Sequence, residues 1–185
     1  MTRDIRFLGR RFTLREALLL GFCATFIVLT RAALRLHFSL PGHSMFFLTF
    51  FLLMARGCVP KIGAATLVGV ISGLVCMLLG MAKLGPLIVA NFILPAMVVD
   101  LAGFAYPRMV RSYIACLLVG VIASATKGVT GILLDYLMGM DPDVVVRHVF
   151  IATIASAIFG ALGAFMVPPV IRRLQANDLI PSSER

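Results

Sequence analysis

Long runs of apolar residues, separated by short polar turns, dominate the hydrophobic pattern of this chain. The clearest pair covers 45–55 and 62–80, which are joined by the basic turn Arg56-Gly57-Cys58-Val59-Pro60-Lys61. This pattern predicts two apolar helices joined by a turn that is too short to hold a domain. Because short cytoplasmic loops of membrane proteins are enriched in Lys and Arg, the turn also indicates which end of the hairpin faces the cytoplasm.

The same pattern predicts six helices along the chain, at 14–36, 45–56, 62–80, 84–106, 112–138 and 144–174. The first has a start signal, because Thr13 and Glu16 have the spacing of a capping box. Turns are expected at 39–44 and 141–143, and Pro107 ends the fourth helix. Pro168-Pro169 predicts a kink or an end in the last membrane segment.

These elements divide the chain into three parts. We expect a basic interfacial N-terminus at 1–12, a six-helix transmembrane domain at 13–174 and a polar tail at 175–185. Composition supports a membrane protein, since 61% of the 185 residues are apolar and a soluble domain of this size does not bury that much apolar surface. The net charge of +9 fits basic loops beside anionic lipid headgroups better than nucleic-acid binding.

The apolar run of the second predicted helix, 45–56, is only about half of the roughly 20 residues that a normal span requires. It is either a short span or a re-entrant segment, and the basic residues decide between the two. With six spans, one side holds Arg3, Arg6, Arg10, Arg11, Arg15, Arg56, Lys61, Arg108, Arg111, Arg172, Arg173 and Arg185. The other side holds only Arg35, Lys83 and Arg147, whereas a re-entrant segment divides the same charges almost evenly. The sequence therefore predicts an all-α membrane protein with six transmembrane helices in one compact bundle, helix 2 short, and N- and C-termini cytoplasmic.

Small residues recur at every fourth position in four of the predicted helices. The stripes are Ala17, Gly21 and Thr25; Ala65, Gly69 and Gly73; Gly120, Ser124 and Gly128; and Ala152, Ser156, Gly160 and Ala164. Such stripes let helix backbones approach closely in lipid. We expect the last three to pack inside the bundle. The stripe in the first helix either does the same or faces a partner subunit.

Polar residues inside the apolar runs are the candidate binding residues, because charges in a span usually face the protein interior or water. Arg31, Asn91 and Lys127 all fall in the half of the bundle away from the basic turn. His43 and Tyr136 lie near the same end. The five are predicted to bind substrate. The alternatives are extension to the interface for Arg31, an ion pair with Asp135 or Asp100 for Lys127, an interhelical hydrogen bond for Asn91, and a turn-shaping role for His43. Asp100, toward the basic end, is expected to be structural or to face a partner.

No catalytic arrangement is present in the sequence, which has no HExxH, no GxSxG and no paired carboxylates at a usable spacing. It has no phosphate-binding loop either, so we expect neither an enzyme nor ATP hydrolysis by this chain. The four cysteines are far apart and form no CxxC. They are predicted to be small core residues, and neither a metal nor a cofactor is expected.

The hairpin at 46–80 also carries a family resemblance. Its apolar run, its basic turn, the Gly63-Ala64-Ala65-Thr66-Leu67 start of the next helix and Gly80 at its end resemble the S components of energy-coupling factor (ECF) vitamin transporters. The subset linked to hydroxymethylpyrimidine and thiamine precursors is the most similar. The family's size, helix count and cytoplasmic termini match almost the whole chain.

The resemblance implies a multi-pass protein of the bacterial cytoplasmic (inner) membrane. It implies capture of a vitamin or related small micronutrient in the outer half, and energy from two separate ATPase subunits on a membrane coupling subunit. In this family the first helix faces that coupling subunit through small residues, a role that Ala17, Gly21 and Thr25 fit. A membrane scaffold or assembly subunit and a self-sufficient secondary carrier remain alternatives. The ligand stays open, since Arg31 and Lys127 suit an anionic group whereas the pyrimidine subset does not require one.

Overall fold

The computed structural model describes residues 5–7, 10–37, 43–81, 87–107, 109–137, 139 and 142–177. Its elements, in chain order, are β1 (Ile5–Phe7), β2 (Arg10–Phe12), α1 (Leu14–His37), α2 (Ser44–Cys58), α3 (Ala64–Leu78), α4 (Leu87–Ala105), the 3-10 helix η1 (Met109–Arg111), α5 (Tyr113–Leu137), α6 (Pro142–Phe165) and α7 (Val167–Ala176). The predicted turn at 39–44 falls largely outside the described residues, as do residues 1–4, 84–86 and 141 and the tail from 178 onward. All six predicted helices are confirmed, with different bounds.

The start of α1 follows the predicted capping box. The Thr13 N–H donates to the Glu16 carboxylate at 2.9 Å, and the Glu16 N–H donates to the Thr13 hydroxyl at 3.4 Å. These reciprocal bonds satisfy backbone donors that the first turn of a helix leaves without an intrahelical partner. Leu14 is accordingly the first residue of α1, as the sequence predicts.

The third helix is shorter than predicted, because a glycine ends it on each side. Gly63 precedes α3 with φ at 92°, and Gly80 follows it with φ at 64°. The N–H groups of Gly80 and Met81 donate to the carbonyls of Met77 and Cys76, at 3.0 and 3.1 Å. This is the Schellman pattern, in which a left-handed residue closes the last helical turn. The predicted range of 62–80 is therefore wrong by two residues at each end.

The last predicted helix is divided in two. α6 ends at Phe165 and α7 begins at Val167. Pro168 and Pro169 have no N–H to continue the bonding ladder across this point. The predicted break is confirmed and lies two residues before the first proline.

The basic N-terminus, for which no strand was predicted, contains two short strands. β1 and β2 pair antiparallel, with Ile5 opposite Phe12 and Arg6 opposite Arg11. Apolar and basic residues alternate in this stretch, and such alternation is typical of a strand. The sequence analysis considered only the net basic charge of the stretch.

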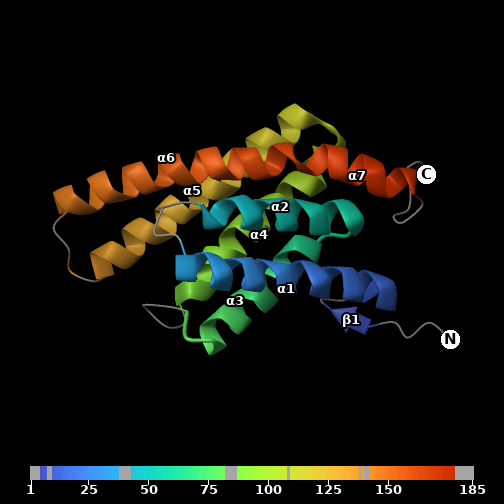
Figure 1. The fold of residues 1–185 in the computed structure, drawn as a ribbon, viewed down its shortest axis with the longest axis horizontal. Helices are drawn as coiled ribbons and strands as arrows, with labels where there is room; N and C mark the ends of the chain where they lie inside the picture. The colour runs from blue at the N-terminus through green and yellow to red at the C-terminus, as the bar shows by residue number, and fades with distance from the viewer. Residues whose placement is uncertain are drawn as a thin grey trace.

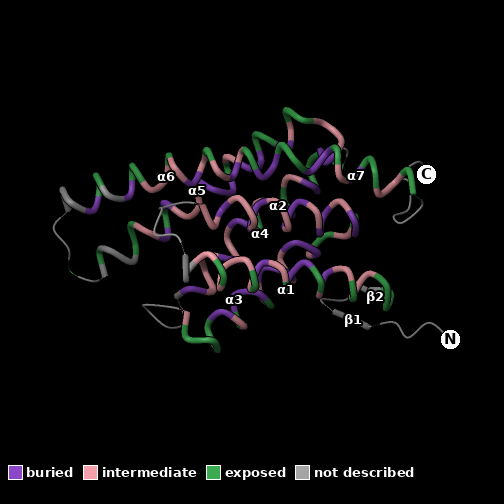
Figure 2. The backbone as a smooth tube through the Cα atoms, in the orientation of Figure 1, coloured by how far each residue is buried: buried purple, intermediate pink, exposed green. Residues whose placement is uncertain are grey.

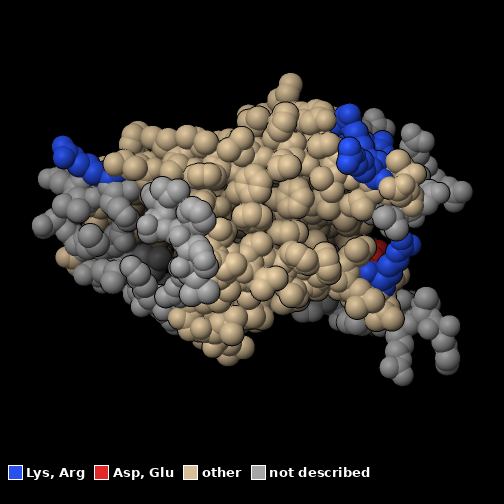
Figure 3. All heavy atoms as spheres, in the orientation of Figure 1, with Lys and Arg blue, Asp and Glu red and all other residues tan. Residues whose placement is uncertain are grey.

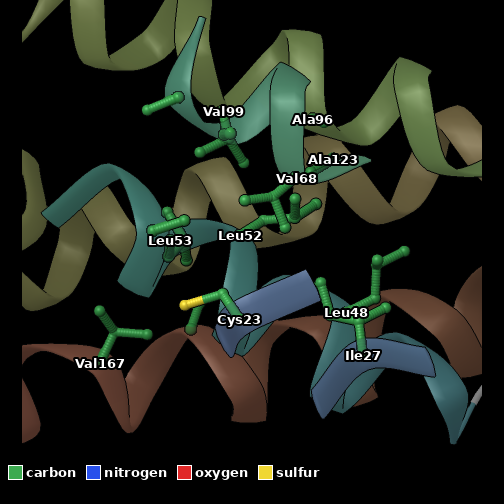
Figure 4. Packing of buried hydrophobic residues seen from close by; sticks show 14 of the residues in the cluster. Cys23, Ile27, Leu48, Leu52, Leu53, Val68, Ala96, Val99, Ala123 and Val167 are labelled. Carbon is green, nitrogen blue, oxygen red and sulfur yellow. The ribbon is translucent and has the colours of Figure 1, made fainter. Parts of the chain in front are cut away.

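The short helix α2 lies at the centre of the bundle, not at its edge. It contacts α1, α3, α4, α5, α6 and α7 (Figure 1). Leu52, Leu53 and Ala55 are completely buried on it, and in Figure 4 Leu48, Leu52 and Leu53 lie between residues of α1, α3 and α7. Figure 2 shows buried backbone where α2 and α4 pass through the middle and exposed turns along α1, α5 and α6. Apolar residues lie on all sides of α2, which is typical of a helix surrounded by other helices.

The small-residue stripes of α3, α5 and α6 face other helices, as predicted. A Cβ added at Gly69 would lie 2.7 Å from the Ala96 Cβ and 2.8 Å from the Phe92 carbonyl oxygen of α4. A Cβ added at Gly120 would lie 2.6 Å from the Ala164 Cβ of α6. The backbones of α3 and α4, and of α5 and α6, thus approach to distances that only glycine permits.

Within the described part of the chain, four segments are long and apolar enough to cross a membrane: Leu14–Leu34, Ile88–Ala105, Tyr113–Leu133 and Val145–Ala176. α2 and α3 are also apolar but have 15 residues each, about 22 Å of helix against a hydrocarbon core of about 30 Å. On the face shown in Figure 3 the described Lys and Arg side chains lie toward the ends of the molecule, with a long band of other residues between them. The starts of α1, α3 and α5 and the end of α7 lie toward the side of the bundle where β1 lies (Figure 1).

Candidate functional site

Arg31 lies in the last third of α1, and its side chain reaches α4. Its guanidinium carbon is 4.6 Å from the centroid of the Phe92 ring, which is completely buried. A cation above an aromatic face is attracted by the negative charge of the ring's π-system. This contact favours an inward position for Arg31 over extension toward the membrane interface.

Asn91 of α4 is joined to α5 through Thr130. The Thr130 hydroxyl donates to the Asn91 Oδ1 atom of α4 and also lies 3.0 Å from the Lys127 carbonyl oxygen. The interhelical hydrogen bond considered for Asn91 is therefore present. We call Arg31, Phe92, Asn91, Thr130 and Lys127 the α1–α4–α5 junction.

The other two predicted binding residues lie away from these contacts. His43 comes directly before α2, where its backbone carbonyl accepts a hydrogen bond from the Phe46 N–H at 3.2 Å. Tyr136 lies about two and a half turns beyond Lys127 on α5, with 69% of its surface exposed. The side chains of Arg31 and Asn91 contact α4 and α5 partners, Phe92 and Thr130, and Lys127 lies one turn before Thr130. His43 and Tyr136 lie toward the ends of their helices.

Asp100 forms a separate polar cluster at the start of α3. Its carboxylate accepts hydrogen bonds from the Ala65 N–H at 3.3 Å, the Thr66 N–H at 2.7 Å and the Thr66 hydroxyl at 2.6 Å. Arg56 of α2 lies 3.8 Å away, and both side chains are almost completely buried. A carboxylate is favoured at a helix N-terminus because the unbonded N–H groups and the helix dipole both attract it. The expected structural role of Asp100 is confirmed, and its partner is Arg56 rather than Lys127. The Asp135 side chain lies outside the described residues.

A second ion pair holds the other end of the basic turn. The Lys61 ammonium lies 2.6 Å from the Glu16 carboxylate of α1, and both side chains are partly exposed. Arg56 and Lys61 therefore connect the turn to α4 and to α1.

The stripe at Ala17, Gly21 and Thr25 differs from the other three, because it lies on an outward face of α1. Nothing lies within 4 Å of a Cβ added at Gly21, and Thr25 is exposed. A shallow cavity of about 520 Å³ lies on this helix, lined by Leu14, Arg15, Leu18, Leu19 and Phe22. The opposite face of α1 is buried, through Leu20, Cys23, Ala24 and Ile27.

The four cysteines are buried with free thiols, which confirms them as core residues. Among the residues that the structure describes, no group of three or more His, Cys, Asp or Glu is placed to hold a metal ion.

Sequence reasoning missed Phe92 and Thr130. Phe92 is one of 14 phenylalanines in an apolar chain, and nothing in its neighbours distinguishes it. Thr130 had a signal, since it follows Lys127 by three residues and therefore lies on the same face of a helix.

No model of a known protein family matches this chain, and no curated protein matches it. Among solved structures, one that is similar is titled "Crystal structure of an S-component of ECF transporter". The two superpose with a TM-score of 0.64 and 16% sequence identity, over 91% of this chain and 88% of the other. The chain therefore has the fold of an ECF transporter S component.

Proposed function

We propose that the chain is the substrate-capturing membrane subunit of an ECF-type importer for a vitamin or related small micronutrient. The similarity in fold over nine-tenths of the chain is the observation that carries this proposal. In it, separate ATPase subunits supply the energy through a membrane coupling subunit, and this chain is not an enzyme. The narrower resemblance to the hydroxymethylpyrimidine and thiamine-precursor subset belongs to the same proposal. It is tested by titrating the purified chain with hydroxymethylpyrimidine and thiamine, and absence of binding would contradict it.

The substrate-binding site is proposed at the α1–α4–α5 junction. Arg31, Asn91 and Lys127 are polar groups on three helices of an apolar bundle, and polar groups in such surroundings are typical of sites for small molecules. The contacts of Arg31 with Phe92 and of Asn91 with Thr130 support this placement. His43 and Tyr136 are assigned to the approach to this site, because they lie toward the ends of their helices.

The partner-facing surface is proposed on α1, at Ala17, Gly21 and Thr25. The contrast with the other stripes supports this: Gly69 and Gly120 are in close contact with neighbouring helices, while Gly21 has open space beside it. An outward stripe of small residues on a membrane helix permits close approach of another helix. The apolar cavity beside the stripe offers further surface for such a helix.

The proposal also includes the topology of the chain. It spans the bacterial inner membrane six times, with both termini in the cytoplasm. The described cations Arg15, Lys61, Arg111, Arg172 and Arg173 lie on segments that meet at one end of the bundle, and Arg147 lies early in α6, toward the other. The positive-inside rule assigns the first end to the cytoplasm. A green fluorescent protein fused after Arg185 should fluoresce, and alkaline phosphatase fused there should be inactive; the reverse result would contradict the orientation.

Assembly with a coupling module is the decisive test. The tagged chain is co-expressed with an ECF coupling subunit and its two ATPases, and the ATPases that co-purify are quantified. We expect a complex with the unmodified chain and its loss in Gly21→Leu, because the new side chain occupies the proposed interface. Ala125→Leu is the matched control, since it places the same side chain at an exposed position on α5.

The outcomes separate the parts of the proposal. If Gly21→Leu retains the complex, the interface is assigned wrongly. If the unmodified chain forms no complex, the ECF proposal fails. Solute flux by the isolated chain in proteoliposomes would instead support a self-sufficient carrier.

A further inference from the structure

We propose that an anionic phospholipid binds where η1, α5 and α7 meet, with its phosphate held by Arg172. We call Arg111, Tyr113, Arg172 and Arg173 the η1–α5–α7 corner. The inference concerns the lipid around the protein and does not depend on the proposed transport function. It stands on the contacts of Arg172, on the charge of the corner and on its position at the ends of membrane segments.

Two contacts orient the Arg172 side chain. Its Nη2 atom donates a hydrogen bond to the Arg111 carbonyl oxygen at 3.3 Å, and its guanidinium carbon is 5.3 Å from the centroid of the Tyr113 ring. The Tyr113 ring in turn lies 5.4 Å, centroid to centroid, from the ring of Phe165 on α6. A cation above an aromatic face is attracted by the ring's π-system. Because these contacts already restrict a side chain with many rotamers, less conformational entropy is lost when it binds a ligand.

The oriented guanidinium still has donors for a phosphate. A guanidinium has five N–H donors, and the bond to Arg111 uses one of them. Because the Arg172 side chain is exposed, the other donors are accessible from the surface. Two parallel N–H groups of one guanidinium match two oxygens of one phosphate. Arg172 can therefore bind the Arg111 carbonyl and a lipid phosphate together.

The corner also concentrates positive charge. Arg111 is a neighbour of Arg172 through its carbonyl, and Arg173 follows on the exposed side of α7. Within the described part of the chain, the two ion pairs are those of Arg56 and Lys61, and neither includes a residue of the corner. On the face shown in Figure 3, Lys and Arg side chains gather where α7 lies in Figure 1. Each cation near a membrane surface adds to its attraction for anionic lipids.

The corner lies where membrane segments end. Tyr113 is the first residue of α5 and of the membrane segment Tyr113–Leu133. The segment Val145–Ala176 has 32 residues, about 48 Å of helix against a hydrocarbon core of about 30 Å. A span that begins at Val145 therefore leaves the core about two turns before Arg172, which places this residue among the headgroups. Tyrosine is enriched at this level of membrane proteins.

The two faces of α7 fit the same position. Val167, Pro168 and Ile171 are buried against the bundle, while Arg172 and Arg173 are exposed. A short helix with an apolar face on the protein and a basic face outward is suited to the interface of a membrane that contains anionic lipids.

The test compares two lipids with the same acyl chains. The full chain, purified in detergent, is titrated with phosphatidylglycerol and with phosphatidylcholine, and bound lipid is counted by native mass spectrometry. Both lipids have a phosphate, but only phosphatidylglycerol has a net negative charge. We expect it to bind roughly 10-fold more tightly or better, as for a hydrogen bond to a charged group. Raising the salt from about 0.1 to 1 M should reduce the preference, because the Debye length falls from about 10 to 3 Å.

Single substitutions test whether the geometry of the corner is responsible. Arg172→Gln should weaken phosphatidylglycerol by roughly 10-fold or more, since it removes the oriented donors. Arg173→Gln is the matched control, because it removes the same charge from the same turn, and its loss should be roughly fivefold or less. Arg172→Lys keeps the charge without the planar donors and should fall between the unmodified chain and Arg172→Gln. Arg147→Gln, at an exposed position early in α6, should have no effect. Unfolding temperatures without added lipid show that the variants fold.

Three results overturn the inference. Equal affinity for the two lipids would show that no anionic lipid is selected. Equal losses in Arg172→Gln and Arg173→Gln would show that binding follows net charge and not the contacts of Arg172. Displacement of phosphatidylglycerol by millimolar inorganic phosphate would show that the ligand is a free phosphate, whereas a bound lipid should remain. The coupling module is absent from these measurements, so none of the three bears on the proposed function.

Discussion

Removal of the Asp100 carboxylate should destabilise this protein more than any other single truncation of a charged side chain at its basic end. In Asp100→Ala, the N–H groups of Ala65 and Thr66 and the Thr66 hydroxyl lose their shared acceptor. Arg56, whose side chain is 7% exposed, loses its carboxylate at 3.8 Å. Breaking a buried ion pair by removing one partner typically costs about 3–5 kcal/mol. For a chain of this size that corresponds to a fall of roughly 6–20 °C in the unfolding temperature.

The assay is thermal unfolding of the purified protein in one detergent, followed by intrinsic tyrosine fluorescence and by light scattering. Glu16→Ala is the comparison, because it also removes a carboxylate from an ion pair with a basic residue. In that pair the Lys61 Nζ and Glu16 Oε2 atoms are 2.6 Å apart, but both side chains are partly exposed. Exposed pairs contribute about 0–1 kcal/mol, so the fall for Glu16→Ala should be several-fold smaller, even with the capping bond included.

A second variant separates charge from hydrogen bonding. Arg56→Met combined with Asp100→Asn removes both charges and keeps an amide oxygen at the start of α3. If the uncompensated guanidinium is the main cost, this pair should be more stable than Asp100→Ala. A fall of less than 2 °C for Asp100→Ala would refute the reasoning, since it would mean that α3 and Arg56 do not depend on this carboxylate.

Three further predictions use the same unfolding assay. Gly160→Ala should lower stability by about 1–3 kcal/mol, because its Cβ would collide with the Ser124 hydroxyl oxygen, whereas Gly21→Ala should be neutral or stabilising, since nothing lies within 4 Å. Gly80→Ala should cost about 1 kcal/mol, because its φ of 64° is left-handed. Thr13→Ala should cost about 1 kcal/mol through loss of the N-cap, and Thr13→Ser should restore it.

Much of the fold could be predicted, because the residues that begin and end helices in this chain act on their immediate neighbours. The capping box at Thr13 and the proline pair at 168–169 set the start of α1 and the break before α7 within two residues. The unequal distribution of Lys and Arg between the two sides of the predicted bundle supported a separate second helix, although its apolar run is short. The central position of α2 could not be predicted, because it depends on contacts with six other helices, most of them distant in the sequence.

The site was predictable only in part, for a related reason. Arg31, Asn91 and Lys127 could be chosen as candidates from the sequence, because a polar residue within an apolar helix is unusual whatever its partners are. Phe92 became informative only when Arg31 was found above its ring. Asp100 had three candidate roles in the sequence, and its distance from Thr66 decided among them.

The two faces of α1 connect the proposed substrate site to the proposed partner surface. Gly21 faces outward, while Arg31 reaches Phe92 inside the bundle. The ten residues between them correspond to about 15 Å of one continuous helix. A rigid helix transmits a change in its tilt from one end to the other, so a substrate that contacts Arg31 would also change how Gly21 is presented. Affinity for the coupling module should therefore differ between protein with and without a bound vitamin. Arg31→Gln should abolish that difference while leaving the affinity without vitamin unchanged. Titration of the coupling module against the chain in nanodiscs measures both affinities, and an equal response to the vitamin in the variant would show that α1 does not connect the two sites.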